Sequence, residues 1–179
     1  MMKFTTKLFL AWMSVFLLFY IAVIIIIGLF WGIRIHLWQL FLVFLIAGML
    51  PPAVITAIFY KRLDYMESEN PEPPAFSGFK RAFLVFRSRS SNRYAEMLQK
   101  IDRNFIVSYS DREAGVVKFR TDCRILAWGV CGYVRLLEDE RVEAIVYPMN
   151  PDSKREEKIL LQTLRLLQSV LSPQGYKGG

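Results

Sequence analysis

Six basic side chains lie between residues 79 and 101 and have the clearest capacity for chemistry in this sequence. Guanidinium groups bind phosphate through paired hydrogen bonds, and a basic residue near an anionic membrane surface gains about 1 kcal/mol. Glu96 is the only acidic residue in this stretch. The pattern predicts a binding site for a phosphorylated ligand or for lipid head groups, with a solvated basic face as the alternative. The candidate residues are Lys80, Arg81, Arg87, Arg89 and Arg93, with Lys100 close by.

A second candidate for anion binding is a predicted helix start at Ser153, Lys154 and Arg155. The first amides of a helix have no partner inside the helix and can receive an anion, and the two basic residues add positive charge. Ser153 and Glu156 also have the spacing of a capping box, which uses some of these amides. A structural helix start is therefore the favoured interpretation.

Acid–base or nucleophilic catalysis finds little support in the sequence. His36 is the only histidine and lies in the apolar N-terminal third, so a Ser-His or Cys-His pair is not available to the rest of the chain. Cys123 and Cys131 are too few for a zinc site and are interpreted as reduced structural thiols. The acidic residues 138–140 predict a solvated turn. We therefore expect a non-enzymatic protein without cofactor or metal.

Two long apolar runs occupy the first sixty residues, at about 8–33 and 37–60. Each exceeds the roughly 20 residues that cross a bilayer as a helix. All 16 acidic residues follow Tyr60, as expected where a charge inside hydrocarbon costs about 3 kcal/mol. The connection between the runs is too short for anything but antiparallel neighbours. Residues 1–62 are therefore predicted to form a two-helix transmembrane hairpin in contact with membrane lipid.

The basic residues at the ends of the two runs predict the orientation of the hairpin. Lys3 and Lys7 precede the first run, Lys61 and Arg62 follow the second, and Arg34 stands alone in the turn. Positive charge is enriched on the cytoplasmic side of membrane helices. We expect a multi-pass protein of the cell inner (plasma) membrane with both termini in the cytoplasm.

Small residues and prolines inside the hairpin predict contact with other helices. Gly28 and Gly32 have GxxxG spacing, which permits close helix packing. Pro51 and Pro52 lie inside the second run, where missing amide donors are expected to kink or break the helix and to free carbonyls near Gly48. Lipid offers these carbonyls no donor. A neighbouring helix, water or a second protomer would supply one, and a simple kink is the alternative.

The remainder of the chain predicts a linker and one small domain. Residues 63–78 are acidic and proline-rich and are interpreted as a linker. Residues 79–173 predict a soluble, cytosolic α+β domain, an antiparallel meander sheet with flanking helices in the order αββββα. Residues 79–86 fit a strand or a short helix equally well, and residues 174–179 predict a disordered tail. The predicted elements are a helix over 93–103, strands over 105–110, 116–120, 124–137 and 142–147, and a helix over 153–171.

Three functions are compatible with this organisation. The leading hypothesis is a membrane-anchored binding module, an adaptor or accessory subunit whose hairpin associates with other transmembrane helices in a homo-oligomer or larger complex. The layout of a two-helix hairpin followed by a small cytosolic domain resembles that of bacterial membrane effectors gated by nucleotide second messengers. This resemblance implies a ligand-gated effector or pore. Sensing of anionic lipid is the third alternative, and nucleic acid is not expected as a partner.

Overall fold

The computed structural model describes residues 4–32, 36–88, 90–121, 129–138 and 140–172. The chain divides into two compact units, Met1–Asp64 and Tyr65–Gly179, which we treat separately. The predicted tail at 174–179 lies outside the described residues.

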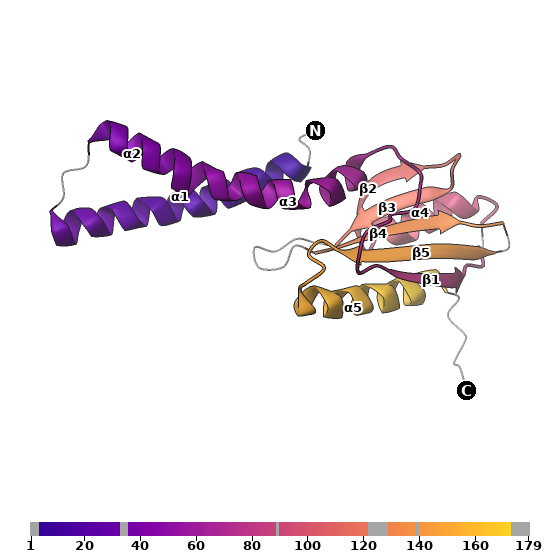
Figure 1. Ribbon diagram of the computed structural model, residues 1–179. Coiled ribbons are helices and arrows are strands. Elements are labelled where there is room, and N and C mark those ends of the chain that lie inside the picture. Colours follow the sequence, from indigo (N-terminus) through magenta and orange to yellow (C-terminus); the bar gives the residue numbers. More distant parts are fainter. Residues whose placement is uncertain (1–3, 33–35, 89, 122–128, 139, 173–179) are drawn as a thin grey trace. The chain divides into compact units, whose positions relative to one another are not determined.

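The first unit is a pair of apolar helices (Figure 1). Two helical spans, Thr5–Phe30 and Leu37–Glu67, are long and apolar enough to cross a membrane, as the two apolar runs predict. The second span is one continuous helical path that changes type on the way. The helices are α1 (Phe4–Trp31), α2 (Leu37–Val43), the π-helical turn η1 (Phe44–Met49) and α3 (Leu50–Glu67).

The proline pair does not break the second span, which differs from one of the predicted outcomes. The π-helical turn η1 stands immediately before it, and the amide of Leu50 donates to the carbonyl of Leu45, five residues back. A π turn adds one residue to a helical turn and is a recognised way to absorb a local defect in the hydrogen-bond ladder. Pro51 and Pro52 then begin α3, where a missing amide donor is tolerated.

The helix α3 continues to Glu67, whereas the sequence predicts an end near Tyr60. The loss of apolar character after Tyr60 marks a change of solvent, but residues 61–67 contain no glycine or proline that would end the helix. Its last residues, from Tyr65 onward, belong to the second unit.

The second unit is a five-stranded antiparallel sheet with spatial order β1-β5-β4-β3-β2 (Figure 1). The α+β class and the four-strand meander are as predicted. Residues 80–85 form a strand, so the order is βαββββα instead of αββββα. The elements are β1 (Lys80–Val85), α4 (Arg93–Asp102), β2 (Ile106–Asp111), β3 (Val116–Arg120), β4 (Val130–Leu136), β5 (Arg141–Pro148) and α5 (Lys154–Leu171).

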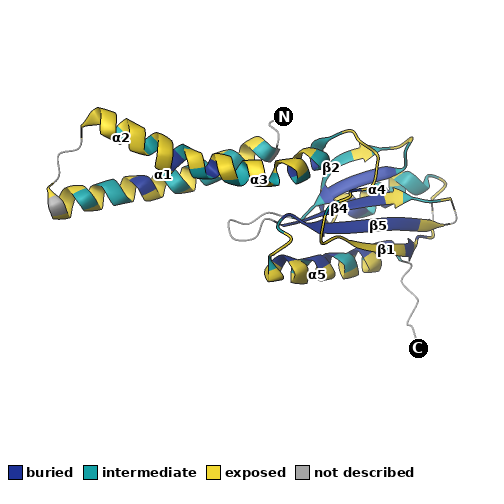
Figure 2. Ribbon diagram, viewed as in Figure 1, coloured by how far each residue is buried: buried dark blue, intermediate teal, exposed yellow. Residues whose placement is uncertain are grey.

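One face of the sheet packs against α4 and α5 and forms the main core (Figure 2). Met97 and Ile101 of α4 and Leu167 of α5 are fully buried there. Gly132 of β4 lies in regular pairing opposite Phe119 of β3. A Cβ atom on Gly132 would lie 2.0 Å from Cζ of Phe119. The glycine therefore makes room for an aromatic ring in the core.

The opposite face of the sheet is covered by residues 65–76, which we call the strap. The hydroxyl of Tyr133 donates to the carbonyl of Pro71 over 2.9 Å, and the rings of Phe76 and Tyr147 lie 5.1 Å apart. Tyr65 packs on the small cluster formed by Val116, Tyr133 and Ile145. Most of the segment interpreted as a linker is thus the second cover of the sheet. The acidic residues and prolines suit the part of the strap after Glu67, because that part belongs to neither a helix nor a strand.

Candidate functional site

The first two predicted basic residues lie on β1, at the edge of the sheet. Nε of Arg81 lies 2.8 Å from Oε1 of Glu143 on the neighbouring strand β5. Lys80 is exposed and, as its neighbour in the strand, points to the other face of the sheet. The two cations therefore do not converge on one ligand.

Arg87 and Arg93 approach the turn between β4 and β5. Nε of Arg87 lies 3.5 Å from Oε2 of Glu140, and Nη1 of Arg93 donates to the carbonyl of Glu138 over 3.2 Å. Arg89 lies outside the described residues. The acidic turn, interpreted from sequence as merely solvated, supplies one acceptor to each arginine. Within the described part of the chain, Nε and Nη2 of Arg93 are buried and have no hydrogen-bond partner.

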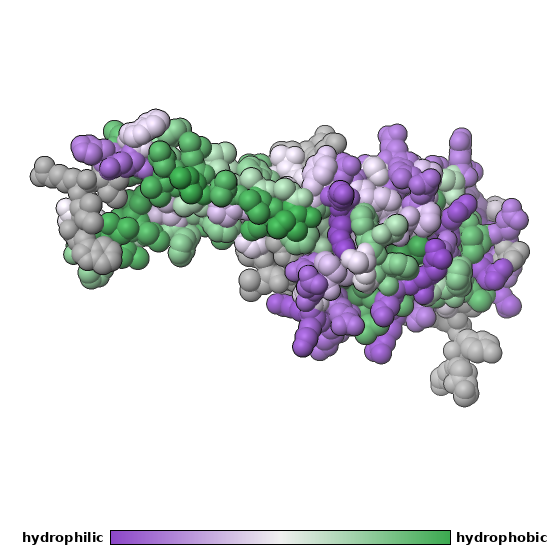
Figure 3. Space-filling view, in the orientation of Figure 1, coloured by the Kyte–Doolittle hydropathy of each residue, from purple (hydrophilic) through white to green (hydrophobic). Residues whose placement is uncertain are grey.

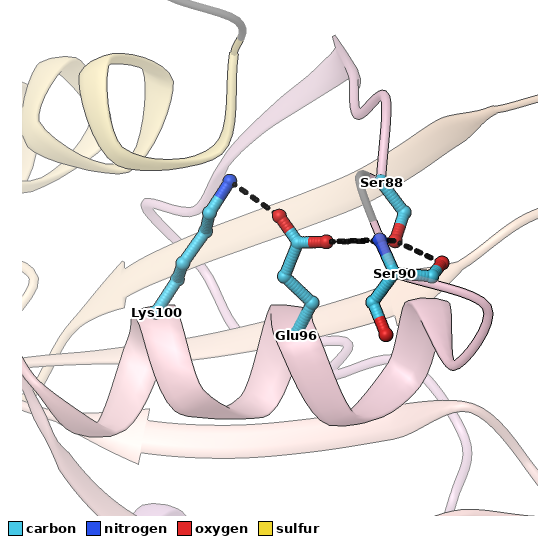
Figure 4. Close-up of polar contacts among 4 residues, drawn as sticks. All are labelled: Ser88, Ser90, Glu96 and Lys100. Atoms are coloured by element: carbon cyan, nitrogen blue, oxygen red, sulfur yellow. Dashed lines mark hydrogen bonds and ion pairs between the residues drawn. The ribbon is translucent and has the colours of Figure 1, made fainter.

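A carboxylate lies at the centre of the basic segment (Figure 4). Oε2 of Glu96 accepts hydrogen bonds from the hydroxyl of Ser88 over 2.8 Å and from the amide of Ser90 over 3.1 Å. Its other oxygen lies 3.1 Å from Nζ of Lys100. A shallow surface pocket lined by Ser90, Ala95, Glu96 and Gln99 opens here. The charged group among its described lining residues is this carboxylate, which is paired with Lys100.

A carboxylate of the chain itself, that of Glu156, lies at the start of α5. Oγ of Ser153 accepts from the amide of Glu156 over 3.4 Å, so the predicted helix cap is confirmed. The carboxylate of Glu156 is buried and accepts from the amide of Asn150 over 2.8 Å. Lys154 and Arg155 are exposed. A carboxylate that already lies at the positive end of the helix dipole favours the structural interpretation of this helix start.

The predicted packing residues of the hairpin have different local roles. Among the described residues, a Cβ atom on Gly28 would have no neighbour within 4 Å. Gly32 follows the last residue of α1 and has φ +58°, the left-handed conformation that ends many helices. Gly48 is buried, and a Cβ atom on it would lie 3.1 Å from the ring of Phe44. The GxxxG spacing therefore forms no single packing face.

An apolar cavity of about 220 Å³ lies between α1 and part of the second span. Phe16, Ile24 and Ile27 line it from α1, and Val43 and Ala47 line it from the opposite helix. At its margin the hydroxyl of Tyr20 donates to the carbonyl of Leu40 over 2.5 Å. This hydrogen bond joins the two helices beside a gap that an apolar chain would fill.

The best-organised polar contact in the second unit is one that the sequence did not indicate. Lys118 of β3 is fully buried, and its Nζ donates to the carbonyls of Tyr65 and Ser68, each over 2.8 Å. It also lies 3.2 Å from the hydroxyl of Ser68. The ammonium therefore caps the carbonyl end of α3, where a positive charge is stabilised.

Aromatic rings complete the surroundings of Lys118. Its Nζ lies 4.0 Å from the ring centroid of Tyr65 and 5.1 Å from that of Tyr109, distances typical of cation–π contacts. The hydroxyl of Tyr109 donates to the carbonyl of Glu69 over 3.2 Å. Burial lowers the pKa of Lys118 to about 8. The lysine remains protonated at neutral pH and attaches the strap to the sheet.

The alternation of apolar and polar residues in β3 explains why the burial of Lys118 is not predicted from the sequence. Val117 and Phe119 point to the helix-covered core, so the lysine between them is expected to face solvent. The strap does contain a signal that it packs on another surface, since Tyr65 and Phe76 are aromatic residues in a segment that is otherwise acidic and proline-rich.

The described residues contain no group of three or more His, Cys, Asp or Glu side chains that could hold a metal ion. The sequence matches no family model, and no curated protein resembles it closely enough to count as a match.

Proposed function

We propose that this protein is a non-enzymatic, membrane-anchored binding module, an adaptor or accessory subunit of a membrane complex. In this proposal the first unit is a transmembrane hairpin of the cell inner (plasma) membrane. Both termini and the second unit lie in the cytoplasm, where the second unit meets the partner.

The exposed apolar surface of the helices carries the proposal. Leu29, Phe30 and Leu37 are 78%, 80% and 88% exposed, and apolar residues dominate the surface over α1 to α3 (Figure 3). Only 6% of the most apolar 18-residue stretch of the first span is buried. Surface of this extent is stable in lipid or against other helices and unstable in water.

Gly28 supports assembly with further helices. It lies in the last turn of the apolar helix α1, and among the described residues of its hairpin nothing fills the space that its missing side chain leaves. Small residues at such positions let two helix backbones approach closely. The apolar cavity beside Tyr20 offers a second place where another helix or an acyl chain would add contacts.

The alternatives receive less support from the basic residues on which they depend. A nucleotide-gated effector or pore, or a sensor of anionic lipid, needs cations that converge on phosphate. Arg81, Arg87 and Arg93 each have an acceptor within their own domain. We therefore favour a protein partner over a phosphorylated ligand.

Fractionation and gentle extraction test the proposal. The full-length protein should stay in the membrane pellet after alkaline carbonate washing, and mild detergent should release it together with other membrane proteins. Gly28→Leu fills the unused space and should reduce this co-purification. Ile26→Leu, at another exposed position of the same helix, is the matched control and should leave it unchanged. Release by carbonate would refute the anchor, and a solitary monomer in detergent would refute the assembly.

A further inference from the structure

Within the described part of the second unit, no strand pairs with the outer edge of β1, and the strand carries an apolar face. β1 ends the sheet, and Ala82 and Leu84 point to the core beneath the helices. The alternate residues therefore point to the strap-covered face, where Phe83 and Val85 remain 59% and 50% exposed. Phe79, directly before the strand, shares this face and is 44% exposed.

The two edges of the sheet differ in how readily they accept another strand. At the β2 edge the pairing with β3 shifts register between Val107 and Tyr109, and irregularities of this kind protect edges from further pairing. β1 pairs with β5 in unbroken register from Lys80 to Val85. A regular edge strand with exposed apolar residues is suited to strand addition.

The charge on β1 also permits a second basic strand to approach. Arg81 is neutralised by Glu143 at 2.8 Å. Lys80 lies at the beginning of the strand and its side chain points to the helix-covered face. The apolar middle of β1 therefore carries little net repulsion against a copy of itself.

We propose that β1 joins the sheets of two copies of this chain, antiparallel and centred on Ala82. In this register Ala82 faces Ala82 of the second copy, and Arg81 faces Phe83 of the second copy on the strap-covered face. Arginine over an aromatic ring is a favourable pair. Phe79 meets Val85 of the second copy in the same way, so apolar area is buried at both ends of the contact.

The residue pattern of β1 is complementary to itself, and this favours a second copy of the chain as the partner at this edge. A two-fold contact makes every favourable pair twice, because each side presents the same strand. When Ala82 pairs with Ala82, the strap-covered faces of the two sheets lie on the same side. A shift of the pairing by one residue would place Phe83 opposite a residue that belongs to the helix-covered face of the second copy. The inference concerns the second unit alone and goes beyond the proposed function.

Cysteine cross-linking of the full-length protein tests the register. In a background with Cys123→Ser and Cys131→Ala, Ala82→Cys places two thiols on directly opposed residues, about 4.5–5.5 Å apart between Cβ atoms. Mild oxidation should give a disulfide-linked dimer. Val85→Cys faces residue 79 of the second copy and Ile106→Cys lies on the other edge, so neither should cross-link. No dimer with Ala82→Cys, or equal dimer with Val85→Cys, would overturn the proposal.

Two further measurements do not depend on the disulfide. Phe83→Lys opposes a lysine to Arg81 of the second copy and should abolish the Ala82→Cys cross-link, whereas Ile106→Lys should not. In the unsubstituted chain, hydrogen exchange at the β1 amides should slow as protein concentration rises, and concentration-independent exchange would contradict pairing. Neither outcome alters resistance to carbonate extraction, so the membrane anchor is tested separately.

Discussion

The ammonium of Lys118 lies 2.8 Å from the backbone carbonyl oxygen of Tyr65, which stands 53 residues earlier in the chain. The contact joins the last turn of α3 to the third strand of the sheet. It uses neutral acceptors and aromatic faces. The connection is thus a buried ammonium group solvated by backbone oxygens and aromatic faces.

Lys118→Met should destabilise the second unit. Methionine fills a similar volume, but it leaves the carbonyls of Tyr65 and Ser68 without this donor, and a buried acceptor that loses its partner costs about 1–3 kcal/mol. Thermal unfolding of the full-length protein in detergent, followed by near-ultraviolet circular dichroism, should show a lower midpoint. Lys158→Met, at an exposed position of α5, is the control and should stay within about 0.5 kcal/mol of the parent. Equal midpoints for the two variants would refute the role of Lys118.

The lowered pKa of Lys118 predicts a pH dependence with a defined sign. Its pKa is about 8 in the folded protein against 10.5 for an ordinary lysine. Between these values the unfolded chain binds more protons than the folded chain, so this group makes stability rise with pH across that window. Lys118→Met should reduce the rise between pH 8 and 10 by comparison with the parent. Parallel stability curves for the two proteins would contradict the buried amine.

Removal of the strap should weaken the sheet. Fragment 65–172 retains the strap, whereas fragment 79–172 exposes the face on which Tyr133 and Tyr147 lie. The shorter fragment should unfold at a lower temperature and bind an apolar dye, since it uncovers aromatic surface in water. Equal midpoints would show that residues 65–76 are only a connection.

Gly132→Ala should be among the most damaging small substitutions in the sheet. The added methyl group would lie 2.0–2.7 Å from atoms of the Phe119 ring, and overpacking of a close-packed core costs about 1–3 kcal/mol or more. A second change, Phe119→Leu, shortens the opposing side chain and should restore part of the loss. A double variant less stable than the sum of the two single effects would contradict this relationship.

The regular elements followed from hydrophobic periodicity. Alternation predicts the hairpin of β2 and β3, and a helical stripe with a serine cap predicts α5, because each pattern reports which face a segment buries. The type of element formed by residues 79–86 could not be predicted, since one run of apolar and basic residues fits a strand and a short helix equally well. The helical end at Glu67 was missed because polarity changes six residues before the helix ends.

The candidate site was less predictable than the fold. Arg81, Arg87 and Arg93 are close in the chain, but the strand and the segments after it direct them to different acceptors. Lys118 could not be identified from its own strand. Its burial is created by the strap, and nothing in the alternation of β3 reports what will cover the face on which it lies.

The strap is synthesised before any of the strands that it covers. Chains are made from the amino terminus, and the hairpin would enter a membrane while the ribosome is still producing the sheet. During that interval Tyr65 and Phe76 lack part of their native surface, because Ile145 and Tyr147 belong to β5, the last strand. Docking of the strap is therefore completed late in biogenesis, when the last strand is in place.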